Sequence, residues 1–486
     1  MNNQYKMAKM YYDSKMYDVA LGLAKKLLEK KFDKVKVFLL LGDIYKSLNK
    51  QKKAIKYFKK ALKKDKNIYT YNSLAQAYNI NGDFELAKDT LKESINKFKN
   101  YSEYKYELAG SCNNIAIIEN KLFNLDEAIN YAFMALKYDM TYMDSYISLA
   151  RSYWLKKNIT NAKLYLKMYM DKNPDDIMGY SYSTLLLASE EYKEGFKYYD
   201  YRLKQQLKDS AHNLLPYEMY QKFDDLKKHS LVIYQEQGYG DNIQFARYLH
   251  TLDKELNISI LVNPKLYKLF KLNFKNFNII KKVDVNIVDG KDLNENFDYK
   301  LPIMSIPYKF NKYFIDTKPY LKAKEKDIKN FKEKNIKKDK LNIGIVWNSS
   351  QKNNSYNEQR LLKLDDFKDL FKIKDTQFYS LQIDNKDDLK NHKNVIDLGQ
   401  DFTDFYDTSV AISALDIVIS IDTSVAHLAG ALGKKTFVLY HSDILDFRWI
   451  VNNNKSIWYD SVEVIEFNKI KKAINTISNR LIELKQ

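Results

Sequence analysis

The sequence predicts an α-helical repeat superhelix followed by an α/β part made of two lobes, and three observations predict it. Small and large apolar residues recur every 33 or 34 positions over the first two hundred residues. From about residue 226, short apolar segments typical of strands alternate with segments of helical periodicity. A charged, lysine-rich stretch at 322–340 then separates two such alternating segments, as a helix or linker between lobes does.

The length of the chain sets its division into domains. A chain of 486 residues exceeds one comfortable hydrophobic core and should divide into two to four domains. We expect the repeat array over residues 1–207, a first α/β lobe over 208–325 and a second over 326–486. Since 45% of the residues are hydrophobic, these parts can form real cores, and wholesale disorder is excluded.

The basic charge of the chain raises the question of nucleic acid. Of 80 basic residues only six are arginine, which leaves 80 − 6 = 74 lysines, and they lie along the whole chain among 62 acidic residues. A solvated lysine-rich surface explains the net charge of +18 better than a nucleic-acid groove does. We therefore expect no nucleic-acid partner.

Three features of the sequence indicate the cellular compartment of the protein. No run of about 18 uncharged apolar residues occurs, so no membrane span is expected. The first residues, MNNQYKMAKMYYDSK, lack the apolar segment of a secretory signal. The single cysteine, Cys112, cannot form an internal disulfide. Together they predict a cytoplasmic protein.

The repeat is helical. Gly42 recurs 33 positions later as Ala75, and Ala116 recurs 34 positions later as Ala150, with large apolar residues at helical spacing between the small ones. Small residues are needed where two helices approach closely. The pattern and its period resemble the tetratricopeptide repeat (TPR) family. About five units run from residue 3 to 174, with an insertion of about seven residues at 101–107, and a degenerate unit continues to residue 203.

In the first lobe, LVIY at 231–234 is an expected strand and QEQGYG the loop after it. The segment 241–256 is an expected helix that Asp241 or Asn242 could cap. Further strands are expected at NISILVNP, FNIIKKV and VNIV. In a chain with few glycines, the paired Gly238 and Gly240 indicate a tight backbone turn.

In the second lobe, strands are expected at LNIGIVWN, TQFYSLQ, VIDLG, LDIVISI and KKTFVLY, and the last helix at 470–484. After LDIVISI, Thr423 or Ser424 can cap a helix that Gly433 ends. The free N–H groups at such a helix start suit a diphosphate. Because ligands of parallel sheets bind at the carboxyl ends of the strands, Asp241 is expected across a cleft from residues 422–427.

Six motifs carry a family resemblance. They are YQEQGYGDNIQFARYL (234–249), FDYKLPIMSIP (297–307), IGIVWNSS (343–350), FYSLQ (378–382), SIDTSVAHLAGALGKKTFVL (420–439) and DFRW (446–449). In order and spacing they resemble the TPR-bearing bacterial glycosyltransferases related to the ADP-heptose heptosyltransferases of family 9. The resemblance implies a GT-B fold of two Rossmann-like lobes. It also implies an inverting, metal-independent sugar transfer, with a nucleotide-diphosphate sugar as donor and no cofactor.

The resemblance assigns roles to residues of this chain. Asp241 matches the family's general base, and Gly238 and Gly240 would let substrate approach it; from the residues alone, a helix cap is the alternative for Asp241. The expected donor site consists of Trp347, Arg360, Asp422, Thr423, Ser424 and His427. Thr423, Ser424 and His427 would hold the diphosphate and Arg360 would pair with phosphate. Asp422 would be an orienting residue of the site, a contact to the ribose of the donor, or a former of the turn.

Two further arginines and the loop before Arg360 also bear on the comparison with the family. Arg247 and Arg448 are expected to brace the lobes. The loop SSQKNNSYNEQ before Arg360 departs from the family's His- or Arg-rich pattern, Leu361 stands where Ser is usual, and Lys352 is a substitute charge. No metal-ligand spacing, phosphate-binding GxxxxGK[ST] loop or GxSxG elbow occurs in the sequence.

Two functions follow as alternatives. The first is sugar transfer to a protein or surface glycan, with the concave face of the array binding the acceptor or a partner. The second is a non-catalytic TPR scaffold that carries a degenerate transferase fold. The retained Asp241 and 423–427 motif favours the first, whereas the altered loop before Arg360 favours the second.

Overall fold

The computed structural model describes residues 2–30, 32–173, 176–206, 227–282, 287–288, 291–292, 297–349, 361–384, 386–442, 446–449, 451–452 and 455–485. The chain forms two compact units, Met1–Met178 and Gly179–Gln486. The boundary between the two units falls within a helix. That helix belongs to the expected repeat array, which was predicted to end at residue 207. The lobe boundaries at 208 and 326 stay predictions.

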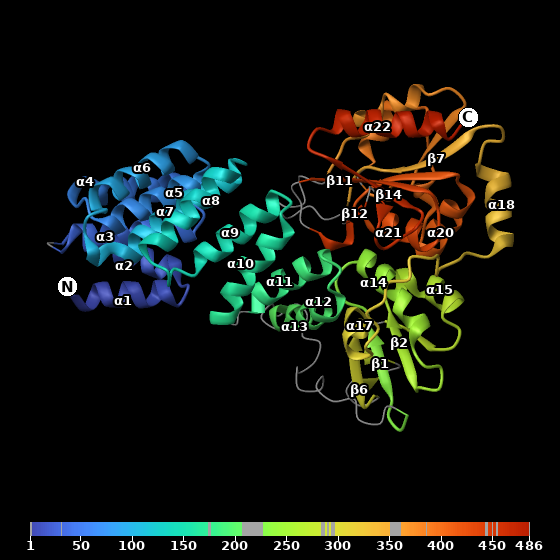
Figure 1. Cartoon of the computed structure of the whole chain (residues 1–486), viewed down its shortest axis with the longest axis horizontal. Helices are drawn as coiled ribbons and strands as arrows, with labels where there is room; N and C mark the ends of the chain where they lie inside the picture. Colours follow the sequence, from blue (N-terminus) through green and yellow to red (C-terminus); the bar gives the residue numbers. More distant parts are fainter. Residues whose placement is uncertain are drawn as a thin grey trace. The chain divides into compact units, whose positions relative to one another are not determined.

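The first unit is a series of helical hairpins (Figure 1). Its helices are α1 (Asn2–Asp13), α2 (Tyr17–Leu28), α3 (Lys34–Ser47), α4 (Gln51–Lys64), α5 (Ile68–Asn81), α6 (Phe84–Phe98), α7 (Lys105–Lys121), α8 (Leu125–Tyr138), α9 (Asp144–Leu155) and α10 (Ile159–Lys172). Helix α11 (Asp176–Ala188) crosses into the second unit, which continues with α12 (Tyr192–Tyr199) and α13 (Tyr201–Gln206). The predicted helical repeats are confirmed.

A left-handed residue marks the turn inside each hairpin. These residues are Lys15, Asn49, Gly82, Phe123, Lys157 and Glu190, with φ between 55° and 88°. Their successive separations are 34, 33, 41, 34 and 33 positions, read from their numbers. The one long interval exceeds the period by 41 − 34 = 7 residues and contains a short 3₁₀ turn, Ser102–Tyr104, where the insertion was predicted.

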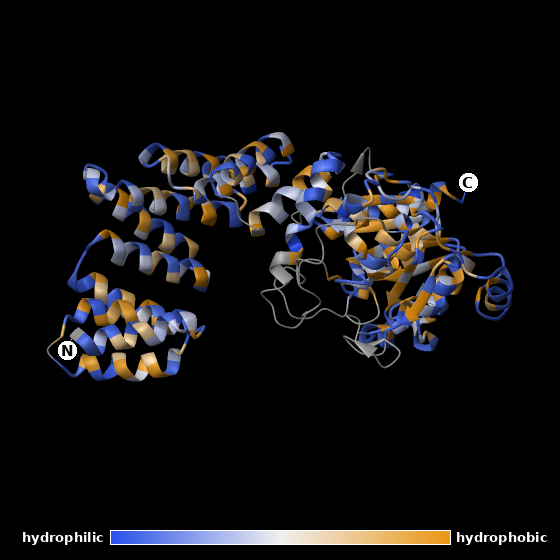
Figure 2. Cartoon of the chain, turned by 90° about the horizontal axis from the view of Figure 1, so that it is seen from below, coloured by the Kyte–Doolittle hydropathy of each residue, from blue (hydrophilic) through white to orange (hydrophobic). Residues whose placement is uncertain are grey.

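Small residues let the paired helices approach. A β-carbon on Gly42 of α3 would lie 2.4 Å from the Phe58 ring of α4, so only glycine fits there. The core cluster that contains Phe58 also contains Ala54 and Ala75, both almost fully buried. Figure 2 shows hydrophobic and hydrophilic residues interleaved along these helices, as expected for helices with one buried face. Stacking of adjacent repeats therefore buries a continuous core.

The first sheet of the second unit is parallel and has the order β3-β2-β1-β6. Its strands are β1 (Leu231–Tyr234), β2 (Ile258–Val262), β3 (Asn278–Lys281) and β6 (Tyr299–Pro302). Helix α14 (Tyr239–Phe245) follows β1, α15 (Pro264–Asn273) follows β2, and η5 (Ile303–Ser305) and α17 (Ile306–Lys309) follow β6.

One local prediction for this lobe was wrong. The helix expected over 241–256 begins earlier and ends as α14 at Phe245, where a 3₁₀ helix, η4 (Ala246–Thr251), continues the chain. Of the strand expected at VNIV, the described residues form β4 (Ile287–Val288), which pairs with β5 (Lys291–Asp292) outside the parallel sheet. Apolar periodicity identified these segments but did not separate α-helical from 3₁₀ turns.

The second sheet has the order β12-β13-β14-β11-β10-β7-β8-β9, antiparallel only at the β12 edge. Its strands are β7 (Leu341–Val346), β8 (Thr376–Ser380), β9 (Val395–Asp397), β10 (Ile417–Ile421), β11 (Thr436–His441), β12 (Val451–Asn452), β13 (Lys455–Ser456) and β14 (Val462–Phe467). Its helices are α18 (Glu325–Asn335), α20 (Phe405–Ala414), α21 (Ser424–Ala431) and α22 (Ile470–Glu483). Helix α22 covers one face of the sheet, and α20 and α21 cover the other (Figure 1).

Both sheets reverse their strand order beside the first strand of the lobe. In order of appearance, the parallel strands of the second sheet run third, second, first, fourth, fifth, sixth, and the first sheet runs third, second, first, fourth. The reversal falls between β1 and β6 in one lobe and between β7 and β10 in the other. Loops at the carboxyl ends of such strands diverge and leave room for ligands.

Candidate functional site

The predicted site residues follow the strands at these two reversal points. The loop after β1 leads to Asp241, the loop after β10 contains Asp422 and Thr423, and Trp347 follows β7. Two lobes therefore contribute polar groups at the positions where parallel sheets bind ligands. The site is built from α14 on one lobe and from α21 and its preceding loop on the other.

Asp241 lies at the third residue of α14. Its Oδ2 accepts a hydrogen bond from the backbone N–H of Gly238 at 3.1 Å, so it satisfies a donor at the start of the helix. Its Oδ1 lies 2.6 Å from Nη2 of Arg448, and 17% of its side chain is exposed. The capping role weighed from the sequence is therefore present, and the role as general base stays a prediction.

Neither Gly238 nor Gly240 adopts a left-handed conformation. Of the glycines that the structure describes, only Gly82 and Gly433 do so. The expected tight turn is therefore not the reason for Gly240. A β-carbon there would lie 2.8 Å from Cδ2 of His427 and 3.4 Å from Cα of Ser424. Gly240 is needed because the starts of α14 and α21 contact each other across the two lobes.

The loop after β10 is tied by side-chain hydrogen bonds. Oδ1 of Asp422 accepts from the indole Nε1–H of Trp449 at 2.6 Å, which favours the orienting role among those predicted for Asp422. Thr423 precedes α21 without capping it through its side chain, and its Oγ1 lies 3.0 Å from Oγ of Ser420. Ser424 is the first residue of α21 and is partly exposed. Phosphate binding by Thr423 and Ser424 stays a prediction.

His427 is buried inside the contact between the lobes. Its Nδ1 lies 2.9 Å from the hydroxyl of Tyr459, and its ring packs on Trp449 with centroids 4.6 Å apart. Only 3% of the residue is exposed. The histidine thus has a packing role, and its phosphate contact stays a prediction.

Of the predicted donor-site residues Trp347 and Arg360, the structure describes only Trp347. Trp347 is fully buried within the core cluster of the second lobe, and its Nε1 has no hydrogen-bond partner in the portion of the chain that is described. Its side chain is a core element, so direct contact with a donor stays a prediction. Arg360 and Lys352 lie outside the described residues.

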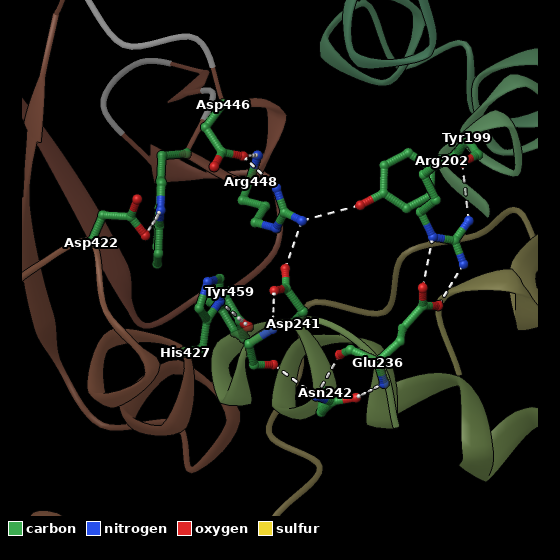
Figure 3. Close-up of polar contacts among 12 residues, drawn as sticks. Tyr199, Arg202, Glu236, Asp241, Asn242, Asp422, His427, Asp446, Arg448 and Tyr459 are labelled. Atoms are coloured by element: carbon green, nitrogen blue, oxygen red, sulfur yellow. Dashed lines mark hydrogen bonds and ion pairs between the residues drawn. The ribbon is translucent and has the colours of Figure 1, made fainter. Parts of the chain in front are cut away.

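Arg448 bridges the lobes more specifically than expected. From η10 (Phe447–Trp449), its Nη1 lies 3.0 Å from Asp446, and its Nη2 contacts Asp241 and donates to the Tyr199 hydroxyl at 3.1 Å (Figure 3). Burial lowers the pKa of the guanidinium, but Asp241 and Asp446 raise it, and the net shift is upward. Arg448 is therefore a permanent cation beside the predicted base.

A second buried ion pair holds the loop after β1. Nε and Nη2 of Arg202, on α13, donate to Glu236 at 3.0 and 2.5 Å, and Nη2 also donates to Ser305 at 2.8 Å. Asn242 closes the loop by donating to the backbone oxygens of Glu236 and Gly238 at 2.8 and 2.7 Å. These contacts fix the backbone that carries Asp241.

Sequence reasoning did not identify Tyr199, Arg202 or Glu236. Tyr199 is fully buried, and the Arg202 guanidinium lies 4.7 Å from the centre of its ring. The scarcity of arginine could have drawn attention to Arg202. It stands in the degenerate last repeat unit, where helix packing alone does not require a charged side chain. Arg247, expected to brace the lobes, donates to the backbone oxygens of Asp316 and Trp458 at 3.0 and 2.7 Å.

The structure also bears on metal binding and on membrane spans. Over the described ranges, no group of three or more His, Cys, Asp or Glu side chains is placed to hold a metal ion. In the same parts of the chain, no helix combines the length and the apolarity that crossing a bilayer requires.

Comparison with known proteins identifies the first unit. The tetratricopeptide repeat family model matches residues 35–67 and 68–96, which hold α3 to α6. The N-terminal region therefore contains tetratricopeptide repeats. No curated protein matches the chain.

Solved structures are similar to part of the chain. One is a thermophilic TPR protein of Thermus thermophilus, with 20% identity, 38% of this chain and 98% of that chain covered, and a TM-score of 0.33. Another is PilF of Pseudomonas aeruginosa, with 16% identity, 45% and 95% covered, and a TM-score of 0.35. A third is the type IV pilus biogenesis factor PilW, with 16% identity, 44% and 94% covered, and a TM-score of 0.36.

Proposed function

We propose that this chain is a glycosyltransferase of the GT-B type, which moves a sugar from a nucleotide-diphosphate donor to a hydroxyl of a protein or surface glycan. The TPR array binds the acceptor or a partner protein, since stacked repeats commonly present a protein-binding surface. The observation that carries the proposal is the position of Asp241 and of residues 422–424. Both follow strands at reversal points, one in each lobe, and the helices that follow them are in contact.

The reaction needs a base, a seat for the leaving group and a reacting carbon between them. The acceptor oxygen attacks the anomeric carbon from the side opposite the donor phosphate, and Asp241 takes the hydroxyl proton. The bond between that carbon and the phosphate oxygen breaks, and its electron pair leaves with the nucleoside diphosphate. The products are the glycoside with inverted configuration, the nucleoside diphosphate and a protonated carboxyl group.

The start of α21 is the proposed seat of the diphosphate. Backbone N–H groups at a helix start point at an anion, and the helix dipole favours negative charge there. Ser424 is partly exposed, and Asp422 is held by Trp449, which keeps the loop in a fixed conformation. Arg448 supplies a cation near this loop, because its chain neighbour Trp449 donates to Asp422.

Thermal unfolding with ADP, GDP, UDP and CMP, without added metal, tests donor binding. A ligand of the native state at one hundred times its Kd adds about 2.7 kcal/mol of stability. The matched control is Ser424→Asp. An acidic residue at a helix start stabilises the helix but repels a phosphate, so this variant should fold and lose the shift.

We expect one nucleoside diphosphate to raise the Tm of the wild-type protein and not that of Ser424→Asp. If none of the four raises it at millimolar concentration, the non-catalytic scaffold becomes the better account of the chain. An equal rise in both proteins would place the nucleotide somewhere other than the start of α21.

A further inference from the structure

Both carboxylate oxygens of the predicted base already have a partner in this structure. One oxygen of Asp241 accepts from Gly238 at 3.1 Å, and the other lies 2.6 Å from Arg448 (Figure 3). Each carboxylate oxygen has about two lone-pair sites, so an acceptor hydroxyl can still reach Asp241, but it competes there with a charge-assisted contact to the guanidinium. Release from Arg448 would leave that oxygen free for the acceptor hydroxyl.

Arg448 carries one positive charge but contacts two carboxylates. Its Nη1 contacts Asp446 and its Nη2 contacts Asp241, while Tyr199 supplies a neutral oxygen. Its Nε is buried and has no hydrogen-bond partner within the described residues. The guanidinium can therefore offer a further donor, or exchange one acceptor for another, while Asp446 continues to hold it.

Arg448 is also next to the proposed diphosphate seat. Its chain neighbour Trp449 donates to Asp422 at 2.6 Å and packs on the ring of His427. The guanidinium thus shares one cluster with the loop before α21. Phosphate oxygens match the planar fork of arginine and carry more charge than a single carboxylate does.

We propose that Arg448 is a donor-sensitive latch: it pairs with Asp241 in the empty site and exchanges Asp241 for the diphosphate when the donor binds. The base is then released to the acceptor hydroxyl when a sugar donor is in place. This inference rests on the proposed function and adds a regulation of the same site. The alternative is a permanent brace, in which Arg448 keeps Asp241 and never contacts phosphate.

The two accounts predict different effects of removing the Asp241 carboxylate. In the latch, the Asp241 carboxylate competes with phosphate for Arg448, so Asp241→Asn should tighten nucleotide binding. Asparagine has the same shape and keeps an acceptor for the Gly238 N–H. Because loss of a negative charge also tightens anion binding without any exchange, the same substitution must be compared in an Arg448→Gln background, as a double-mutant cycle.

The experiment is titration calorimetry of the full chain with UDP, ADP, GDP and inorganic pyrophosphate. The four proteins are wild type, Asp241→Asn, Arg448→Gln and the double variant, each first shown to melt cooperatively. Pyrophosphate reports on the diphosphate seat whatever the nucleotide base. We expect Asp241→Asn to bind about fivefold tighter, which is about 1 kcal/mol, and Arg448→Gln about tenfold weaker. The double variant should bind as weakly as Arg448→Gln.

Three results would overturn the latch. If Asp241→Asn binds no tighter than the wild-type protein, Arg448 is a permanent brace, and the proposed transferase stands. If Asp241→Asn tightens binding by the same factor in both backgrounds, the gain is simple charge repulsion without exchange. If no probe binds any of the four proteins, the proposed function fails and the latch fails with it.

Discussion

A β-carbon added to Gly240 would lie 2.8 Å from Cδ2 of His427, so the first lobe contacts the second through a position without a side chain. The contact joins the start of α14 to α21, the two helices that carry Asp241 and His427. It explains one of the two glycines beside Asp241 by packing between lobes. The same contact sets the separation of the predicted base and the predicted diphosphate seat.

Gly240→Ala should therefore destabilise the second unit by about 1–3 kcal/mol, as overpacking of a close contact does. The matched control is Gly238→Ala, because φ is −81° at Gly238 and its added carbon would meet only the Asp241 carboxylate end, at 3.3 Å. That variant should change stability by less than about 0.5 kcal/mol. Urea unfolding of both proteins measures the difference, and equal losses would show that the contact at His427 relaxes without cost.

The buried Arg202–Glu236 pair should be costly to break. The two side chains are 3% and 5% exposed, so Arg202→Met leaves the Glu236 carboxylate buried without its cation and should cost about 3–5 kcal/mol. Arg480, which pairs with Glu463 and Glu483 and has 45% of its side chain exposed, is the control. Arg480→Met should cost less than about 1 kcal/mol. Similar losses for both, measured by chemical unfolding, would contradict the buried network.

Two glycines of the array should respond to alanine with opposite sign. Gly82 has φ of +88° at a hairpin turn, so Gly82→Ala should destabilise the array by about 1 kcal/mol. Gly22 lies inside α2, and nothing is within 4 Å of an added β-carbon, so Gly22→Ala should stabilise by about 0.5–1 kcal/mol. Thermal melts of the two variants check the signs. A stabilising Gly82→Ala would mean that the turn conformation differs from the one described.

Cys112 gives a reporter for unfolding of the array. It is fully buried in α7, and burial raises the pKa of its thiol to about 12. The reactive thiolate is therefore scarce in the native protein at pH 8, and a maleimide should label Cys112 only after unfolding. Labelling followed by mass measurement across a urea series should follow the loss of helical signal. Rapid labelling without denaturant would show that α7 is exposed.

The sequence predicted the elements better than the contacts between them. The period of 33 or 34 residues follows from helix packing, so Gly42, Ala75 and the insertion near residue 101 identified the repeats without other information. The apolar runs of β1, β2, β7, β10 and β11 were similarly clear, because fully buried parallel strands are continuous hydrophobic segments. Strand order was not predicted, since it depends on pairings between residues far apart in the chain.

The site was predicted in its residues but not in its partners. Asp241 and the loop at 422–424 could be located because strand ends and helix starts are local features. Arg448 was expected only to brace the lobes, because its pairing with Asp241 joins residues more than two hundred positions apart. Tyr199 and Arg202 were missed for the same physical reason. Their function depends on a tertiary contact that repeat periodicity does not encode.

The central claim is that the chain transfers sugar with Asp241 as base. Its most direct test is release of nucleoside diphosphate from a panel of UDP-, GDP- and ADP-sugars by the purified protein, with water as the acceptor. We predict slow release from one donor by the wild-type protein and at least about a hundredfold less by Asp241→Asn, since a general base contributes about that factor or more. No release from any donor, or equal rates for the two proteins, would contradict the account.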